Sequence, residues 1–177
     1  LTCAAGKIQI EDKSNISIVG TDRAAEFDSF GITISAGSNI IISNLRIHQV
    51  GTGDSDCLGI TNGAHQIWID HCDIYNDLNE AAATTPYDSL MDINKGADFI
   101  TVSWSRFHDH VKSMYIGASD ENEAQDKGKL HITFHHNRFT DISPGILSVR
   151  FGTVHAFNNI FENLSPENAG EGTGLSS

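Results

Sequence analysis

The sequence repeats one short pattern, and this repetition limits the folds open to the chain more than any other feature. Two apolar residues separated by one position are followed by polar residues and another apolar residue. Six copies can be read, at 14–20, 38–47, 65–74, 98–107, 130–139 and 153–161. One apolar position aligns throughout, at Ile18, Ile42, Ile69, Val102, Phe134 and Ala156, with spacings of 24, 27, 33, 32 and 22 residues. Period-two alternation of β-branched and aromatic residues predicts a strand in each copy.

The repetition of one strand-rich unit of variable length along the chain predicts an all-β solenoid, the parallel β-helix. Leucines at fixed offsets are absent, a propeller blade needs about 40 residues, and a β-sandwich has no common register between units. Equivalent residues of successive β-helix coils stack about 4.8 Å apart. Two such columns are expected at the turn after the aligned strand: Asn44, His71, Trp104, His136 and Asn158, then Leu45, Cys72, Ser105, Asn137 and Asn159. Asparagine suits this bend because it tolerates left-handed backbone. Weak helical character is confined to 78–83 and 121–129.

The composition is that of a globular protein, and we expect one domain over residues 1–177. The formal net charge of -12 and the pI of about 4.9 argue against nucleic acid or an anionic membrane as a partner. No apolar run approaches the roughly 18 residues that span a bilayer. An acidic substrate would be repelled by such a chain unless a cation lay between the two.

The cysteines and the sequons favour a secreted protein. Cys3, Cys57 and Cys72 allow one disulfide and one free thiol, and the pairing is open. The triplets that begin at Asn15 and Asn163 would accept glycans in a eukaryotic secreted protein.

Acidic residues gather in the longest segments between the repeats, 50–64 and 75–97, where function is usually found on a regular scaffold. Asp54 and Asp56 alternate on an extended segment and can converge, and Asp88 and Asp92 lie four residues apart. Several carboxylates without thiolates favour a hard cation, Ca²⁺ above Zn²⁺. The alternative is that these are ordinary turn and cap residues.

The remaining polar residues give weaker signals. His108 and His110 share a face, but no zinc motif accompanies the nine histidines, so we interpret them as stacked or hydrogen-bonded structural groups. Lys112 and Arg138 are surface residues by default. Arg150 lies between two apolar residues and therefore needs a partner or a groove.

Four segments carry a family resemblance: WIDHCDI (68–74), DINKGADFITVSWSRFHDHVKSMYIGASD (92–120), KLHITFHHNRF (129–139) and VRFGTVHAFNNIFEN (149–163). Over roughly residues 35–165 the sequence resembles the pectate lyases of polysaccharide lyase family 1. The resemblance implies a right-handed parallel β-helix and a secreted, monomeric enzyme. It also implies Ca²⁺-dependent β-elimination of polygalacturonate, in which the cation acidifies the C5 proton and a basic side chain removes it.

By motif, the calcium acids of the family fall on Asp56, Asp88 and Asp92, with Asp54 as a fourth candidate. The lysine of the D-H-x-K stretch falls on Lys112 and the arginine of V-R-F-G on Arg150. Both are expected to bind substrate carboxylates and are our candidates for catalytic residues.

The family pattern R-x-P-x-x-R-F-G is broken, because Gly145 and Leu147 replace its first arginine and its proline. That arginine is the base in the family. Three explanations stay open: Lys112, Arg150 or Arg138 substitutes; the chain is a weak or inactive relative; or Gly145 is a variant or engineered change. Arg138 is also a candidate substrate-binding residue.

The family members are also longer, so the chain is either compact with other caps, a piece of a larger molecule, or associated through one end. The rival functions are a catalytically inactive carbohydrate-binding β-helix, a pectin lyase, which would lack the calcium acids, and a structural β-helix.

Overall fold

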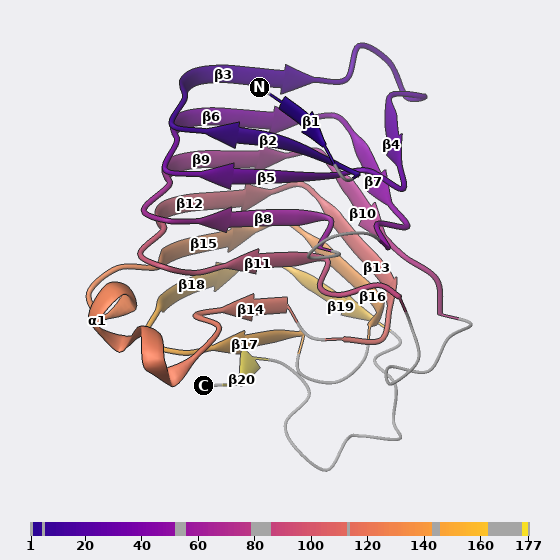
Figure 1. Ribbon diagram of the computed structural model, residues 1–177. Coiled ribbons are helices and arrows are strands. Elements are labelled where there is room, and N and C mark those ends of the chain that lie inside the picture. Colours follow the sequence, from indigo (N-terminus) through magenta and orange to yellow (C-terminus); the bar gives the residue numbers. More distant parts are fainter. Residues whose placement is uncertain are drawn as a thin grey trace.

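The chain winds into a solenoid whose coils each contribute one strand to each of three sheets (Figure 1). The structure is a computed structural model and describes residues 2–4, 6–51, 56–78, 86–112, 114–142, 146–162 and 175–176. Neighbouring strands within a sheet come from successive coils and run parallel, except for β1 and β2, which are antiparallel. The predicted parallel β-helix is confirmed, and its hand is right-handed as in the solved structures that it matches.

Sheet 1 carries the candidate site. Its strands, in spatial order, are β1 (Thr2–Ala4), β2 (Lys7–Glu11), β5 (Gly31–Ser35), β8 (Leu58–Thr61), β11 (Met91–Ile93), β14 (Met114–Ile116), β17 (Leu147–Val149) and β20 (Leu175–Ser176).

Sheets 2 and 3 complete each coil. Sheet 2 contains β3 (Ser14–Val19), β6 (Ser38–Ser43), β9 (His65–Asp70), β12 (Asp98–Ser103), β15 (His131–His135) and β18 (Thr153–Phe157). Sheet 3 contains β4 (Glu26–Asp28), β7 (Arg46–His48), β10 (Asp73–Tyr75), β13 (Arg106–His110), β16 (Arg138–Ile142) and β19 (Ile160–Glu162).

The repeat register read from the sequence is confirmed pair by pair in sheet 2. The strand partners include Ile18 with Ile42, Ile42 with Ile69, Ile69 with Val102, Val102 with Phe134, and Phe134 with Ala156. Four of these residues, Ile42, Ile69, Val102 and Phe134, are fully buried. Burial of each such side chain contributes about 1.5–3 kcal/mol, so the ladders hold the solenoid together.

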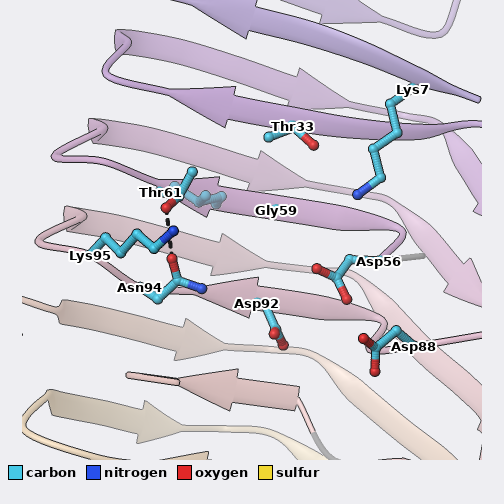
Figure 2. A pocket seen from close by; sticks show the side chains of 10 residues that line it. Lys7, Thr33, Asp56, Gly59, Thr61, Asp88, Asp92, Asn94 and Lys95 are labelled. Carbon is cyan, nitrogen blue, oxygen red and sulfur yellow. Dashed lines mark hydrogen bonds between the residues drawn. The ribbon is translucent and has the colours of Figure 1, made fainter. Parts of the chain in front are cut away.

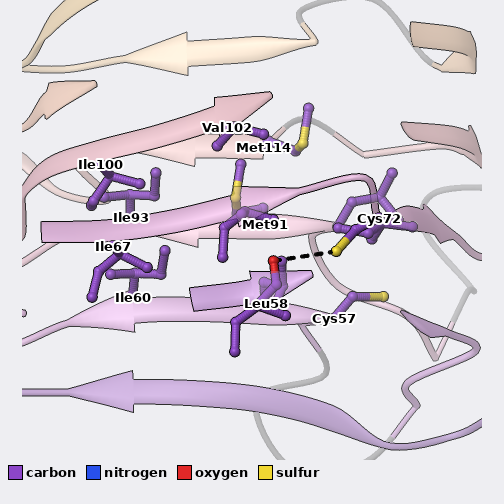
Figure 3. Close-up of a cluster of buried hydrophobic side chains, with 14 of the residues drawn as sticks. Cys57, Leu58, Ile60, Ile67, Cys72, Met91, Ile93, Ile100, Val102 and Met114 are labelled. Atoms are coloured by element: carbon purple, nitrogen blue, oxygen red, sulfur yellow. Dashed lines mark hydrogen bonds between the residues drawn. The ribbon is translucent and has the colours of Figure 1, made fainter. Parts of the chain in front are cut away.

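The core continues these ladders around the coil. Figure 3 shows part of it, with side chains from sheets 1 and 2 facing each other. In sheet 3 the rings of Phe107, Phe139 and Phe161 stack at centroid distances of 5.3 and 5.0 Å. Offset aromatic stacking at these distances adds to the effect of burial.

The predicted turn columns are also present. Asn44, His71, Trp104, His136 and Asn158 all have left-handed backbone, with φ between 48° and 56°. Left-handed backbone costs a residue other than glycine or asparagine about 1–2 kcal/mol. Ring stacking offsets this cost, because Trp104 lies 4.4 Å from His136 and 6.2 Å from His71 between ring centroids.

In the next column a polar ladder replaces apolar packing. The Asn137 side chain accepts a hydrogen bond from the Ser105 amide at 2.9 Å and donates to the Val102 carbonyl at 2.9 Å and to Asn159 Oδ1 at 3.1 Å. Because Asn137 is 1% exposed, these bonds satisfy groups that water cannot reach.

Helical structure is short, as the sequence predicts. Segment 121–129 contains part of η1 (Asp120–Asn122) and all of α1 (Glu123–Asp126), while Leu78 is the one residue of 78–83 that the structure describes. Among the described residues, no helix is long and apolar enough to cross a membrane.

The disulfide that the sequence allowed is not formed. Cys3 is an exposed free thiol, and Cys57 and Cys72 are buried free thiols. The two buried sulfurs contact Asn76 Oδ1 and the Ile42 carbonyl instead of each other. Burial raises the pKa of Cys57 to about 12 and that of Cys72 to about 11, so neither is a reactive thiolate at neutral pH.

Candidate active site

A polar pocket of about 360 Å³ lies on the outer face of sheet 1, over β2, β5, β8 and β11 (Figure 2). It is lined by Lys7, Thr33, Asp56, Gly59, Ile60, Thr61, Asp88, Asp92, Asn94 and Lys95. Three of the four predicted calcium acids are therefore brought together from two successive coils.

Strand geometry explains why these acids face the pocket. Met91 and Ile93 on β11 are 1% and 0% exposed and point into the core (Figure 3). Asp92 between them must point outward because successive side chains of a strand alternate. Asp56 precedes β8 and Asp88 precedes β11, so both acids lie where the chain enters sheet 1.

Backbone amides hold two of the carboxylates. The Ser89 amide donates to Asp56 Oδ1 at 3.1 Å, and the Tyr115 amide of the next coil donates to Asp92 Oδ1 at 3.0 Å. Charge-assisted bonds of this kind fix the carboxylates and favour their ionised form.

Burial nevertheless dominates the electrostatics of the pocket. Burial is the largest of the effects that together raise the pKa of Asp56 to about 8; the charges of Asp92 and Asp88 also raise it, whereas the charge of Lys7 and the hydrogen bond from the Ser89 amide lower it. Burial also raises the pKa of Asp92 to about 6, against the hydrogen bonds from Ser89 and Tyr115. The pocket thus holds carboxylates whose negative charges are poorly solvated and repel one another.

The predicted basic residues fall in three places. Lys112 Nζ lies 3.5 Å from Asp88 Oδ1, next to the pocket. Arg150 follows β17, which lies in sheet 1 two strands beyond β11. Arg150 therefore does not line the pocket. Arg138 begins β16 in sheet 3, where its Nε donates to Glu162 Oε2 at 2.8 Å, so the structure does not bring it to the acids.

Arg150 is held in place by the preceding coil. Its Nε lies 2.7 Å from Asp120 Oδ1, and Nη1 donates to the Ala118 carbonyl at 3.1 Å. The partner that the sequence required for this arginine is thus Asp120.

Two predicted positions, Asp54 and Gly145, lie outside the described residues. The sequence motifs do not indicate seven further residues that line the pocket: Lys7, Thr33, Gly59, Ile60, Thr61, Asn94 and Lys95. A second alignment, over the strands of sheet 1, could have found several of them. Thr33, Gly59 and Asp92 occupy equivalent positions on β5, β8 and β11.

The donor chemistry of the pocket fits a hard divalent cation. Asp56, Asp88 and Asp92 offer only carboxylate oxygens, the ligands that Ca²⁺ prefers, and their mutual repulsion would be relieved by a cation. Within the described part of the chain, however, no three acidic, histidine or cysteine side chains already stand close enough to hold a metal ion. The ligand types of Asp56, Asp88 and Asp92 suit Ca²⁺, whereas their side chains in this structure are not close enough together to coordinate one ion.

His108 and His110, the two histidines that share a face, are stacked or hydrogen-bonded as predicted. His108 stacks on Tyr75 at 4.6 Å and contacts Asp73 and Asp109 at 3.0 and 2.7 Å. His110 is fully buried, and burial lowers its pKa to about 4.

Fold and pocket define a class of protein: a parallel β-helix with an acidic, polar pocket on the face of one sheet. Residues 3–175 match the family described as pectate lyase. Over 161 residues the chain is 42% identical to the pectate trisaccharide-lyase of Bacillus licheniformis, covering 91% of this chain and 46% of that protein. It is 40% identical over 157 residues to pectate lyase A of Emericella nidulans, covering 89% and 47%. The chain belongs to the pectate lyase family.

Solved structures of pectate lyases have the same fold as this chain. A pectate lyase from a Bacillus species, in complex with trigalacturonate, superposes with a TM-score of 0.81 at 34% identity and covers 90% of this chain and 51% of that one. Pectate lyase II of Xanthomonas campestris gives a TM-score of 0.79 at 28% identity, with 92% and 51% covered. The chain thus spans about half the length of the relatives that it matches.

Proposed function

We propose that this chain forms the calcium and substrate site of a secreted pectate lyase, which cleaves α-1,4-linked galacturonan by β-elimination. The observation that carries the proposal is the meeting of Asp56, Asp88 and Asp92 in one pocket with Lys112 beside it. The trigalacturonate complex of a similar structure supports a uronate polymer as the substrate class. Action outside the cell fits a polymeric substrate.

Charge explains why this pocket would use a cation. The substrate is a polyanion, the chain carries a net charge of -12, and the pocket itself is acidic. Bound Ca²⁺ would neutralise the substrate carboxylate and acidify the proton at C5. Asp56, Asp88 and Asp92 are the residues that would hold it.

The basic residues take the other roles. Lys112 stands at the pocket edge, with its side chain 30% exposed, where an ammonium group can bind a uronate carboxylate. Arg150, oriented by Asp120 and the Ala118 carbonyl, presents the rest of its guanidinium group further along the same sheet. A chain of uronates laid across sheet 1 would meet the acids and then this arginine.

A binding protein without lyase activity is the second candidate, and Gly145 is the observation that favours it. Loss of a positioned base costs a factor of about 10²–10⁴ in rate. Of the three candidate substitutes, Lys112 lies beside the acids, 3.5 Å from Asp88 Oδ1, and we propose it as the base. We therefore expect slow, Ca²⁺-dependent cleavage.

The test is to incubate the protein with polygalacturonate and follow the ultraviolet absorbance of the unsaturated product, with Ca²⁺ and with EDTA. We expect a weak signal that EDTA abolishes, that Lys112→Met reduces, and that Gly145→Arg raises by about 10²–10⁴. Lys127→Met is the control, because Lys127 pairs with Glu123 on α1 and is exposed. Retained binding of oligogalacturonide with no product, even from Gly145→Arg, would establish the binding protein instead.

A further inference from the structure

Lys7 is a buried lysine in the acidic pocket. It lies on β2, near the start of the described chain, and only 5% of its surface is exposed. Lysine is rarely buried unless it is paired, because removing its charge from water is costly. In Figure 2 its ammonium end points toward Asp56. A buried cation therefore faces a buried carboxylate across the intervening strand β5 of sheet 1.

Gly31 on β5 makes this approach possible. Lys7 pairs with Gly31 in the register of β2 and β5, so the neighbour of Lys7 on the next coil has no side chain. A Cβ at this glycine would lie 2.6 Å from the Asp56 carbonyl oxygen, so the missing side chain lets the backbone of Asp56 come close to β5 beside Lys7. Adjacent strands are about 4.8 Å apart, and the long flexible stem of lysine can extend past the bare position.

The charge of Lys7 acts on two of the three acids. It opposes the effect of burial at both Asp56 and Asp92. Lys95 lines the same pocket but lies near Thr61 and Asn94, at the opposite end from Asp56 (Figure 2). The two lysines thus occupy one pocket in different electrostatic positions, which provides a matched pair for experiment.

We propose that Lys7 is the internal counter-ion of the acidic pocket: it stabilises the pocket when no divalent cation is bound, and it lowers the affinity for such a cation by repulsion. The second half of this statement rests on the proposed function, and the first half does not. Lys7 would set the Ca²⁺ concentration at which the site fills, without being a ligand.

The experiment compares Lys7→Met, which keeps the length of the stem and removes the charge, with Lys95→Met and with Lys7→Arg, which keeps the charge. Melting temperature is measured in EDTA at pH 8, and Ca²⁺ affinity is measured by titration calorimetry. We expect Lys7→Met to melt about 2–4 °C below Lys95→Met, equivalent to a stability loss of about 1 kcal/mol, and to bind Ca²⁺ about ten-fold more tightly. Lys7→Arg should resemble the wild type in both measurements. If Lys7→Met does not fold, Lys7→Gln takes its place.

The outcomes separate the two proposals. Equal melting temperatures for Lys7→Met and Lys95→Met in EDTA would overturn the counter-ion role. Unchanged or weaker Ca²⁺ binding by Lys7→Met would overturn the control of affinity. If wild type and variant both fail to bind Ca²⁺ while Lys7→Met still melts lower, the proposed calcium site fails and the counter-ion role stands.

Discussion

Asp56→Asn should stabilise the metal-free protein at alkaline pH. The folded-state pKa of Asp56 is about 8, against an ordinary value of 3.8. Between these two pH values the Asp56 side chain is protonated in the folded protein and ionised in the unfolded chain. The contribution of Asp56 to stability is therefore greatest below pH 3.8 and is lost as the pH rises through 8. Asparagine cannot ionise, and its Oδ1 can still accept the Ser89 amide hydrogen bond. The variant therefore keeps the contact and loses the pH-dependent cost.

The magnitude follows from the shift. One pKa unit corresponds to 1.36 kcal/mol, so the cost to the wild type at pH 8 is at most about 5 kcal/mol. Water entering the open pocket relieves part of it, and we expect about 2–4 kcal/mol. For a chain of this size, the variant should then melt roughly 4–16 °C above the wild type.

The assay is thermal unfolding followed by circular dichroism in EDTA, at pH 4 and at pH 8. At pH 4 the two proteins should melt within a few degrees of each other, and the difference should open as the pH rises. Asp88→Asn is the control, because it removes the same charge from the same pocket but from a side chain that is 54% exposed. A gain that is equal at both pH values, or no larger than that of Asp88→Asn, would refute the reasoning.

Two further predictions concern the scaffold. Phe107→Ala should lower the free energy of unfolding in urea by about 3–5 kcal/mol, since Phe107 is fully buried in the stacked rings of sheet 3. Phe99 is 61% exposed, so Phe99→Ala should lower it far less. Equal losses of stability for the two variants would contradict the stabilising role of the buried ring stack. Gly117→Ala should lower the free energy of unfolding more than Gly63→Ala does, although both glycines have positive φ. A Cβ at Gly117 would lie 2.2 Å from the Arg150 carbonyl oxygen, whereas a Cβ at Gly63 would meet nothing within 4 Å. If the two glycine variants unfold at the same urea concentration, that close approach is not important.

The register of sheet 2 was predictable from the sequence because its strands are long. Six residues, as in β9 and β12, are enough to show the alternation that aligns Ile69 with Val102. The strands of sheet 1 at the site are shorter, four residues in β8 and three in β11. Segments this short do not show a period by themselves, so the positions equivalent to Asp92, which are Thr33 and Gly59, emerge only when the strands of sheet 1 are aligned with one another.

Other features depend on where each coil bends. Arg138 and Lys112 are both basic residues beside a repeat, but Arg138 begins a strand of sheet 3, whereas Lys112 lies in the connection from β13 to β14, next to Asp88. Lys7 is separated from Asp56 by a whole coil, and only the stacking of β2, β5 and β8 brings the two together. The acids themselves were found because the family motifs place them, and the structure then showed that they share a pocket.

The central claim is that Asp56, Asp88 and Asp92 form a calcium site, and its most direct test is calorimetric titration of Ca²⁺ into the metal-free protein. The wild type should bind one Ca²⁺, and Asp92→Asn should bind at least about ten-fold more weakly, because a carboxylate ligand becomes a neutral amide. Asp22→Asn, an exposed acid away from the pocket, should bind like the wild type. Equal affinities for the wild type, Asp92→Asn and Asp22→Asn, or no binding by any of them, would contradict the account.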